Sequence, residues 1–560
     1  MKFSDMPYQR VDLEAVRTSF RDLTERMEKA GSGAEQFAIH QEYYAFFGHV
    51  MTEATLAGIR HDIDMSDPFY TEEQQFYDEI MPEVTHLNVI YNRKLLNSPY
   101  RPYLEEKIGK PAFKNIEIQE KSVDEVILPL MQEENRLKER YNQLLSSARI
   151  DWHGESLNLS LMNPYLQDKD RQVRVEAYEK FFAFFSENQE ELDEIYDRLV
   201  KNRTAQAAKL GYENFLPLGD FRMNRNCYGR EEMRAFREQV KRDFVPFAEK
   251  LHERRRQRLG LKRLHFEDEK IYFPDGNPAP VLSPEGILDA GKKMYGELSP
   301  ETWEFMDFMT ENELFDVQGR KNKKTGGYMT YLQDFKSPFI FANFNGTQGD
   351  VDVITHECGH AFQGYLSGKD PILEHGDITM ETAETHSMSM EFFTEPWMKL
   401  FFGARSQDYV DMHFEDSCVF IPYGTMVDEF QEIVYQNPGL SPKERRQVWR
   451  ELERVYKPHL DYSGNEYLES GGFWQRQHHI YEFPFYYLDY AIAQTDALQY
   501  KVWMDRDYQA AWESYLHLCR LSAKDFYTGL LPQVSLRSPF EDGCLRDVVR
   551  ELSRKLCLPE

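Results

Sequence analysis

Residues 339–362, FIFANFNGTQGDVDVITHECGHAF, contain a run of strand-forming residues, a turn and the start of a helix. The aromatic and branched side chains at 339–344 are typical of a strand, and Asn345-Gly346 favours a turn. Val351 and Ile354 then supply apolar positions for a helix that continues past residue 360. The stretch therefore predicts a small sheet directly beside a helix.

Outside this stretch, helical periodicity dominates the chain. Long charged segments with helical spacing occupy 123–147, 171–210 and 231–258, whereas strands and turns are expected only around 271–347. Near the start, apolar residues recur at steps of three and four before a glycine: Leu13, Val16, Phe20, Leu23 and Met27. We predict a mainly α fold with one small sheet.

The composition limits the class of protein. The chain has 560 residues, 67 Lys and Arg against 95 Asp and Glu, a net charge of −28 and 41% hydrophobic residues. A large core is possible, and a nucleic-acid-binding surface is not expected. No segment has the apolar length of a signal peptide or a membrane span, and the six cysteines form no CxxC pair. These features favour a cytoplasmic protein with reduced thiols and no membrane partner.

His356-Glu357-Cys358-Gly359-His360 is the segment that carries chemistry. Two histidines four residues apart lie on one helix face, so both imidazoles can reach one metal ion. Glu357 is offset by one position, where a general base can contact a water beside the metal. Cys358 points away from this face and is expected in the core. The motif predicts a hydrolytic zinc site.

A catalytic zinc needs a third protein ligand, and the extended motif HExxHxxGxxH is absent because Gln363 and Leu366 replace its glycine and histidine. The segment 380–391 offers the candidates. Glu384 and Glu391 lie two helical turns apart on one face, so one can bind the metal while the other orients its surroundings. From the residues alone, Glu381 and His386 remain competing ligands.

The HExxH segment followed after 24 residues by Glu-x-x-Ser-x-x-x-Glu resembles the oligoendopeptidase F and thimet oligopeptidase superfamily of zinc peptidases. The resemblance is closest to the oligoendopeptidase F branch, which includes Pz-peptidase-like enzymes, and further matching stretches lie at 344–347, 427–431 and from residue 478. It implies Glu384 as third ligand, Glu391 as a carboxylate that orients a ligand without binding the metal, and one Zn²⁺ per chain. It also implies two helical lobes enclosing a substrate channel, with residues 1–200 as N-terminal lobe and 201–560 as catalytic lobe, the lobes being intertwined.

The aromatic segment 478–490 resembles the family's C-terminal His/Tyr region, whose side chains face the zinc. A Tyr hydroxyl or a His N–H there can stabilise the oxyanion formed in amide hydrolysis. Tyr490 is the first candidate and His479 the second, with the adjacent His478 as its alternative, and either Tyr486 or Tyr487 can take a further role. Without the zinc motif, the same segment would be interpreted as an aromatic core stripe.

The strand at 339–344 allows two interpretations. Its edge can pair with a peptide backbone, with Phe344 and Gly346 in contact with substrate. Equally, Gly346 can simply permit a tight turn.

We therefore predict a zinc endopeptidase that hydrolyses short unstructured peptides through a water activated by the metal, with Glu357 as general base. Two alternatives are open: a zinc carboxypeptidase or amidase with the same site, and a peptide-binding protein with a structural metal. The expected partners are short peptides, and the protein is expected to be a monomer or a small homo-oligomer.

Overall fold

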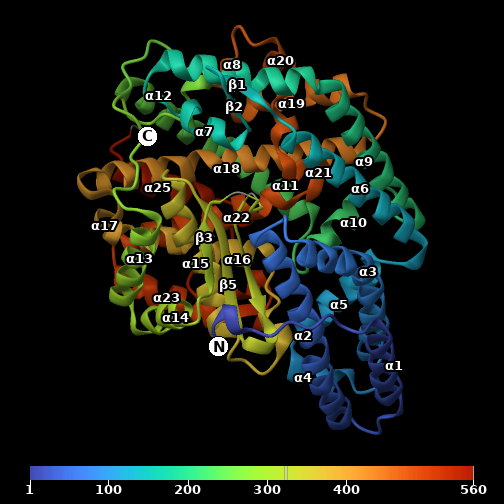
Figure 1. Cartoon of the computed structure of the whole chain (residues 1–560). Helices are drawn as coiled ribbons and strands as arrows, with labels where there is room; N and C mark the ends of the chain where they lie inside the picture. The colour runs from blue at the N-terminus through green and yellow to red at the C-terminus, as the bar shows by residue number, and fades with distance from the viewer. Residues whose placement is uncertain (321, 325, 559–560) are drawn as a thin grey trace. The chain divides into compact units, whose positions relative to one another are not determined.

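The computed structural model describes residues 1–320, 322–324 and 326–558 (Figure 1). It divides into two compact units, each built from three segments of the chain. Unit 1 comprises Met1–Glu125, Ala279–Ala404 and Trp503–Leu536, and unit 2 comprises Val126–Pro278, Arg405–Val502 and Arg537–Glu560. The boundary predicted near residue 200 falls inside unit 2, because the chain passes repeatedly from one unit to the other and no change in composition marks these passages.

Unit 1 contains twelve α-helices and three strands within its described residues. The helices are α1 (Leu13–Lys29), α2 (Gly33–Ile63), α3 (Pro68–Leu96), α4 (Arg101–Ile108), α5 (Lys110–Ser122), α13 (Pro284–Leu298), α14 (Pro300–Glu311), α15 (Gly349–Ser367), α16 (Met380–Phe393), α17 (Met398–Phe402), α23 (Tyr508–Leu521) and α24 (Tyr527–Gln533). The strands are β3 (Phe315–Gln318), β4 (Tyr328–Leu332) and β5 (Ser337–Phe344).

Within its described residues, unit 2 is helical apart from one short hairpin, β1 (Ile150–Trp152) and β2 (Glu155–Leu157). Its helices are α6 (Leu128–Ser146), α7 (Asn163–Leu166), α8 (Arg171–Glu187), α9 (Gln189–Lys209), α10 (Phe215–Arg222), α11 (Arg230–Gln239), α12 (Val245–Arg258), α18 (Ser406–Gln436), α19 (Pro442–Tyr456), α20 (Glu466–Glu469), α21 (His478–Glu482), α22 (Tyr486–Met504, which ends just beyond the unit) and α25 (Cys544–Lys555). The prediction of a mainly α fold with a small sheet is confirmed.

The N-terminal amphipathic helix lies where the sequence predicts it. Asp12 caps α1 by accepting hydrogen bonds from the backbone N–H groups of Glu14 and Ala15. Its apolar stripe is buried in a core shared with α2 and α3, through Val16, Phe20, Leu23 and Met27. The spacing of three and four residues thus marks the buried face.

The three-stranded sheet has the order β3-β5-β4, with β5 parallel to β3 and antiparallel to β4. The prediction that a peptide adds to the edge of β5 is wrong, because β5 is the central strand. Its apolar residues are buried since the strand is covered on both faces, and α15 packs against it (Figure 1). The burial of Phe344 fits this central position.

The turn between β5 and α15 is held by one carboxylate. Asp350 accepts hydrogen bonds from the backbone N–H groups of Asn345, at 2.9 Å, and Gly346, at 2.7 Å. Gly346 has φ 84°, a conformation that favours glycine, so the tight-turn interpretation is supported. Asp350 and Asp352 also place negative charge in the first turn of α15, where the helix dipole favours it.

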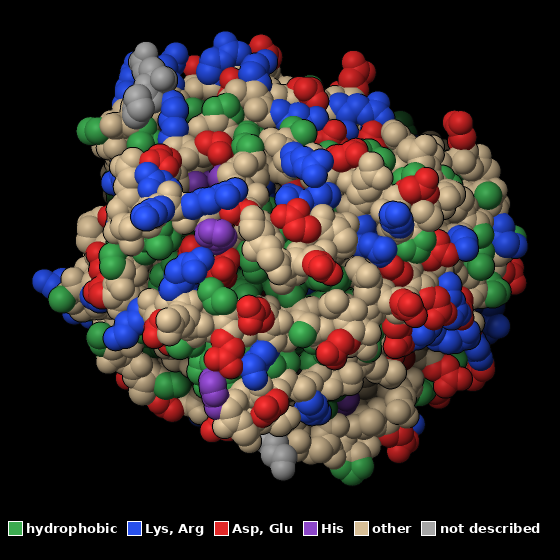
Figure 2. All heavy atoms as spheres, turned by 90° about the horizontal axis from the view of Figure 1, so that it is seen from above, with side chains coloured by type: hydrophobic (Ala, Val, Ile, Leu, Met, Phe, Trp, Pro, Cys, Tyr) green, Lys and Arg blue, Asp and Glu red, His purple; other side chains and the backbone are tan. Residues whose placement is uncertain are grey.

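Of the described helices, none combines the length and the apolar character needed to cross a membrane. Four cysteines, Cys358, Cys418, Cys519 and Cys544, are buried as free thiols. On the face shown in Figure 2, Lys and Arg side chains are interspersed with Asp and Glu.

Candidate metal centre and active site

The predicted metal ligands converge within unit 1. His356 and His360 project from α15 and Glu384 from α16, and one ligand atom of each lies within 4.8 Å of the others. The carboxylate Oε2 of Glu384 is 3.3 Å from Nε2 of His356 and 3.5 Å from Nε2 of His360. Two imidazoles and one carboxylate are a donor set typical of catalytic zinc, and they leave a position open for water or substrate.

Further polar groups contact these predicted ligands. Glu391 accepts a hydrogen bond at 2.6 Å from Nδ1 of His356, which leaves Nε2 of that ring to face Glu384. Ser387 donates its hydroxyl to Oε2 of Glu384 at 2.9 Å. Such carboxylate and hydroxyl partners fix the ring and the carboxylate of metal ligands, so the surroundings of the site fit a bound metal.

The charges of the cluster attract a cation. Burial disfavours the imidazolium of His356, but hydrogen bonds to Glu384 and Glu391 outweigh burial and raise the pKa of His356 well above its ordinary value. Burial likewise opposes ionisation of Glu384, yet His360 and His356 hold its pKa well below the ordinary value. Both shifts have the same cause, which is that the carboxylates and imidazoles of the cluster together favour positive charge.

The two competing ligands do not belong to the converging group. Glu381 is fully buried and accepts a hydrogen bond from the hydroxyl of Thr379 at 2.6 Å. His386 is also fully buried, and burial together with the neighbouring His360 lowers its pKa to about 3. His386 is thus a neutral core residue.

Glu357 and Cys358 lie as the helix geometry predicts. Glu357 is half-buried next to the predicted ligand His356, whereas Cys358 is fully buried on the opposite side of α15. Burial raises the pKa of the Cys358 thiol, so it stays protonated and has no role as a ligand.

Gly359, within the motif, determines how closely α15 and α16 approach. A Cβ at this position would lie 2.6 Å from Cα of Ser387 and 2.9 Å from the carbonyl oxygen of His386. Any larger residue would push α16, and with it Glu384, away from the histidines. The HExxH motif leaves position 359 unspecified. The requirement for glycine there comes from the close contact with α16, a helix that follows later in the chain.

The aromatic residues predicted to serve the reaction gather in unit 2. His479 lies on α21, and its ring centroid is 5.7 Å from that of Tyr486, 4.8 Å from Tyr487 and 6.3 Å from Tyr490. All four side chains are half-buried, so each keeps part of its surface exposed. Gln477 lies 3.0 Å from Nδ1 of His479 and can donate its amide N–H to it, which leaves the proton of the ring on Nε2.

Burial raises the pKa of Tyr487 to about 12. Tyr486 and Tyr490 lie one turn apart on α22, with ring centroids separated by 4.7 Å. Tyr490 therefore shares a helix face with Tyr486.

A second group of possible ligands, His252, Glu269 and His459, lies in unit 2. Both ring nitrogens of His459 already contact carboxylates, Nδ1 with Glu249 at 2.7 Å and Nε2 with Glu269 at 2.8 Å. Lys457 pairs with Glu269 at 2.9 Å, and the rings of His252 and His459 are stacked 3.5 Å apart. Stacked rings do not aim their nitrogens at one metal, so we interpret this group as an ion-pair network.

This network predicts a pH-dependent stability. Burial lowers the pKa of His459, but Glu249 and Glu269 outweigh it and raise that pKa above 6.5. The charged pairs of His459 therefore stabilise the fold fully at a pH below the pKa of this histidine in the unfolded chain. This stabilisation is lost as the pH rises through the pKa of His459 in the folded protein. Replacing His459 by Gln should lower stability by about 1.5–3 kcal/mol for each charged hydrogen bond at pH 6, and by less at pH 9.

Calorimetric melting of wild type and H459Q across this pH range tests the prediction. His49→Gln, which removes a more exposed His–Asp pair, is the control and should change the melting temperature little. A loss for H459Q that is independent of pH would show that His459 is not charged in the fold.

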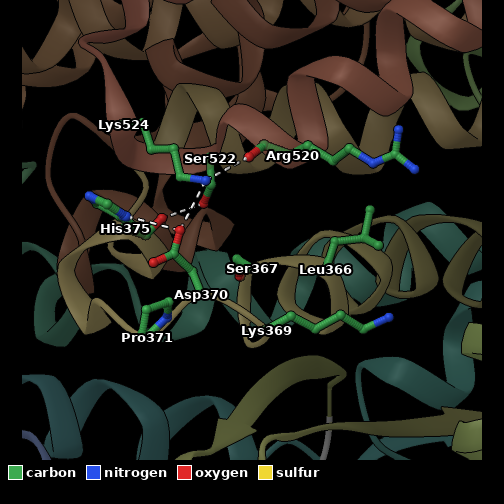
Figure 3. A pocket seen from close by; sticks show the side chains of 9 residues that line it. All are labelled: Leu366, Ser367, Lys369, Asp370, Pro371, His375, Arg520, Ser522 and Lys524. Atoms are coloured by element: carbon green, nitrogen blue, oxygen red, sulfur yellow. Dashed lines mark hydrogen bonds and ion pairs between the residues drawn. The ribbon is translucent and has the colours of Figure 1, made fainter.

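A pocket of about 310 Å³ lies at the C-terminal end of α15, and its charges are paired (Figure 3). In Figure 3, Lys524 and His375 both point to Asp370, at 2.9 and 3.0 Å. The remaining two cations pair outside this view, Lys369 with Glu304 and Arg520 with Glu301. None of the predicted metal ligands lines this pocket. We interpret its ion pairs as contacts that hold the end of α15 against the segment that follows α23.

Comparison with known families decides the classification. The model of the peptidase M3 N-terminal domain matches residues 3–123, and that of peptidase family M3 matches residues 164–274 and 300–518. The chain belongs to peptidase family M3. The second match includes the whole HExxH segment and Glu384, so the predicted superfamily is confirmed.

Individual relatives agree with the family. A solved structure of PZ peptidase A with an inhibitor is 46% identical to this M3 chain, with a TM-score of 0.95 and 99% of each chain covered. A structure described as a candidate oligoendopeptidase F is 45% identical, with a TM-score of 0.95, and covers 100% of this chain and 99% of its own. Oligopeptidase PepF of Bacillus subtilis is 21% identical over 70% of this chain, and the match spans 58% of PepF.

Proposed function

We propose that this M3 protein is a zinc endopeptidase that hydrolyses internal bonds of short peptides. The observation that carries the proposal is the convergence of His356, His360 and Glu384 on one point, with Glu357 beside them on α15. Membership of the M3 family and the likeness to PZ peptidase A and to oligopeptidase PepF support the substrate class. We further propose one zinc ion per chain and a cytoplasmic location.

Each residue then has a defined task. Zinc, when bound by His356, His360 and Glu384, polarises a carbonyl and acidifies a water molecule. Glu357 accepts the proton of the attacking water and delivers it to the departing amine, so that one carboxylate serves as base and then as acid. Glu391 holds the ring of His356 in its ligand orientation through the 2.6 Å hydrogen bond.

We propose that Tyr490 and His479 donate hydrogen bonds to the carbonyl oxygen as it gains negative charge. A tyrosine hydroxyl and the Nε2–H of His479 are suitable donors, and both side chains are partly exposed within the aromatic cluster of α21 and α22. Tyr486 is the next candidate because it shares the helix face of Tyr490. Phe344 is buried and Gly346 forms a turn, so we propose no contact between substrate and either residue.

Removing the hydroxyl of Tyr490 should slow catalysis without weakening peptide binding. In Y490F, kcat should fall about 10²–10³-fold while KM changes little, because the hydrogen bond strengthens only as charge develops. Steady-state kinetics with one quenched peptide measures both constants. Tyr165→Phe, on α7 of the same unit, is the control, since its ring contacts Trp152 and none of the proposed catalytic residues. An unchanged kcat in Y490F would exclude the role.

End-group dependence separates an endopeptidase from an exopeptidase. A peptide blocked at both ends and its free-ended counterpart should be cut at the same internal bond, as identified by mass spectrometry. Cleavage of the free-ended peptide alone would instead indicate a carboxypeptidase using the same site. Cleavage of neither peptide at any length would favour a peptide-binding protein.

A further inference from the structure

The residue that precedes α22 has an unusual backbone conformation. Phe485 has φ 74°, in the left-handed region that residues with a side chain rarely adopt. It stands directly before Tyr486, and α22 carries all three tyrosines of the aromatic cluster in its first turns. Such a conformation persists only where surrounding contacts impose it.

Arg225 supplies the main contact. Its side chain is fully buried, and one terminal nitrogen donates to the carbonyl oxygen of Phe485 at 2.7 Å and to Oδ1 of Asp489 at 3.1 Å. The other terminal nitrogen donates to Asp220 at 2.8 Å. One guanidinium therefore ties both ends of the first turn of α22 to a fixed point.

The opposite side of Phe485 is held as closely. Its backbone N–H donates to Oε1 of Gln431 at 3.1 Å, and its ring lies under the guanidinium of Arg230 at 4.1 Å. The ring also lies against Gly219 of α10, where a Cβ would come within 2.4 Å of it. Only glycine at position 219 leaves room for this ring.

We propose that Arg225 and Gly219 are positioning residues that set the rotation of α22 and thereby the direction of the Tyr490 hydroxyl. Asp489, which Arg225 holds, is the residue before Tyr490, and successive residues are turned by about 100° around a helix. Because Arg225 holds the buried side chain of Asp489, the helix cannot rotate freely about its axis. The directions in which Tyr486 and Tyr490 project are therefore fixed as well. The inference rests on the role of Tyr490 in the proposed function.

A double-mutant cycle tests whether these residues act through Tyr490. Gly219→Ala should force the Phe485 ring to move and lower kcat at least 10-fold, with zinc content unchanged and KM altered less than the rate. In the Y490F background the same substitution should lower kcat less than 3-fold, because the group that it misdirects is already gone. Gly439→Ala, where a Cβ would meet no atom within 4 Å, is the matched control and should leave kcat unchanged.

Arg225→Lys provides a second variant if G219A does not fold. Lysine keeps the charge but cannot contact Asp220, Phe485 and Asp489 together, so R225K should lower kcat. This loss of kcat should also vanish in the Y490F background. If G219A or R225K lowered kcat by the same factor in wild type and in Y490F, the inference would be overturned, while the role of Tyr490 would stand. Full activity of Y490F itself would overturn the role of Tyr490 and the inference with it.

Discussion

Glu357→Gln should lower kcat for peptide hydrolysis by about 10²–10⁴-fold, while the purified protein keeps its zinc. The amide has the size of the carboxylate but cannot accept a proton from water at neutral pH. Glu357 does not belong to the group of converging ligand atoms, so its replacement should leave zinc affinity unchanged. Activity assays and metal analysis on the same preparations measure both results.

Glu304→Gln is the matched control for this substitution. Glu304 lies on α14 of the same unit, and its exposed side chain pairs with Lys369. Its replacement should leave kcat unchanged, since exposed ion pairs contribute little. If E357Q retained both its zinc and the wild-type kcat, Glu357 could not be the general base.

The two glutamates of α16 should differ in their effect on zinc binding. Glu384→Gln should weaken zinc binding by more than about 100-fold, because it removes a negatively charged ligand from the metal itself. Glu391→Gln should weaken binding by about 10–100-fold, because it acts only through the ring of His356. Competition with a chromophoric chelator measures the two affinities.

Activity adds a second distinction between these variants. The peptidase activity of E391Q should recover when zinc is supplied in excess, whereas E384Q should remain nearly inactive under the same conditions. Circular dichroism of both proteins without metal controls for folding. Equal affinities of E384Q and E391Q would mean that Glu384 is not a ligand.

The parts of the site that depend on local geometry were predictable from the sequence. An i,i+4 pair of histidines must share a helix face, and His356 and His360 do so on α15. The choice of Glu384 over Glu391, Glu381 and His386 came from the family resemblance, because periodicity alone left all four open. In the structure, Glu384 belongs to the converging group, Glu391 accepts a hydrogen bond from His356, and Glu381 and His386 lie in the core.

The features that escaped prediction depend on contacts between distant segments. The run 339–344 predicted a strand, but its central place between β3 and β4 follows from pairings that no local pattern encodes. Gly359 is required because α16 crosses α15 at that residue, and the backbone of Phe485, which has a positive φ, is bonded to the distant residues Arg225 and Gln431.

We expect one zinc ion at His356, His360 and Glu384 to be necessary and sufficient for internal peptide cleavage by this chain. The most direct measurement is the hydrolysis of an end-blocked quenched peptide by chelator-treated wild-type protein during titration with zinc. Activity should be absent at the start, rise linearly and reach its maximum at one equivalent of zinc per chain. Full activity before any zinc is added, or none at saturation with zinc, would contradict the account.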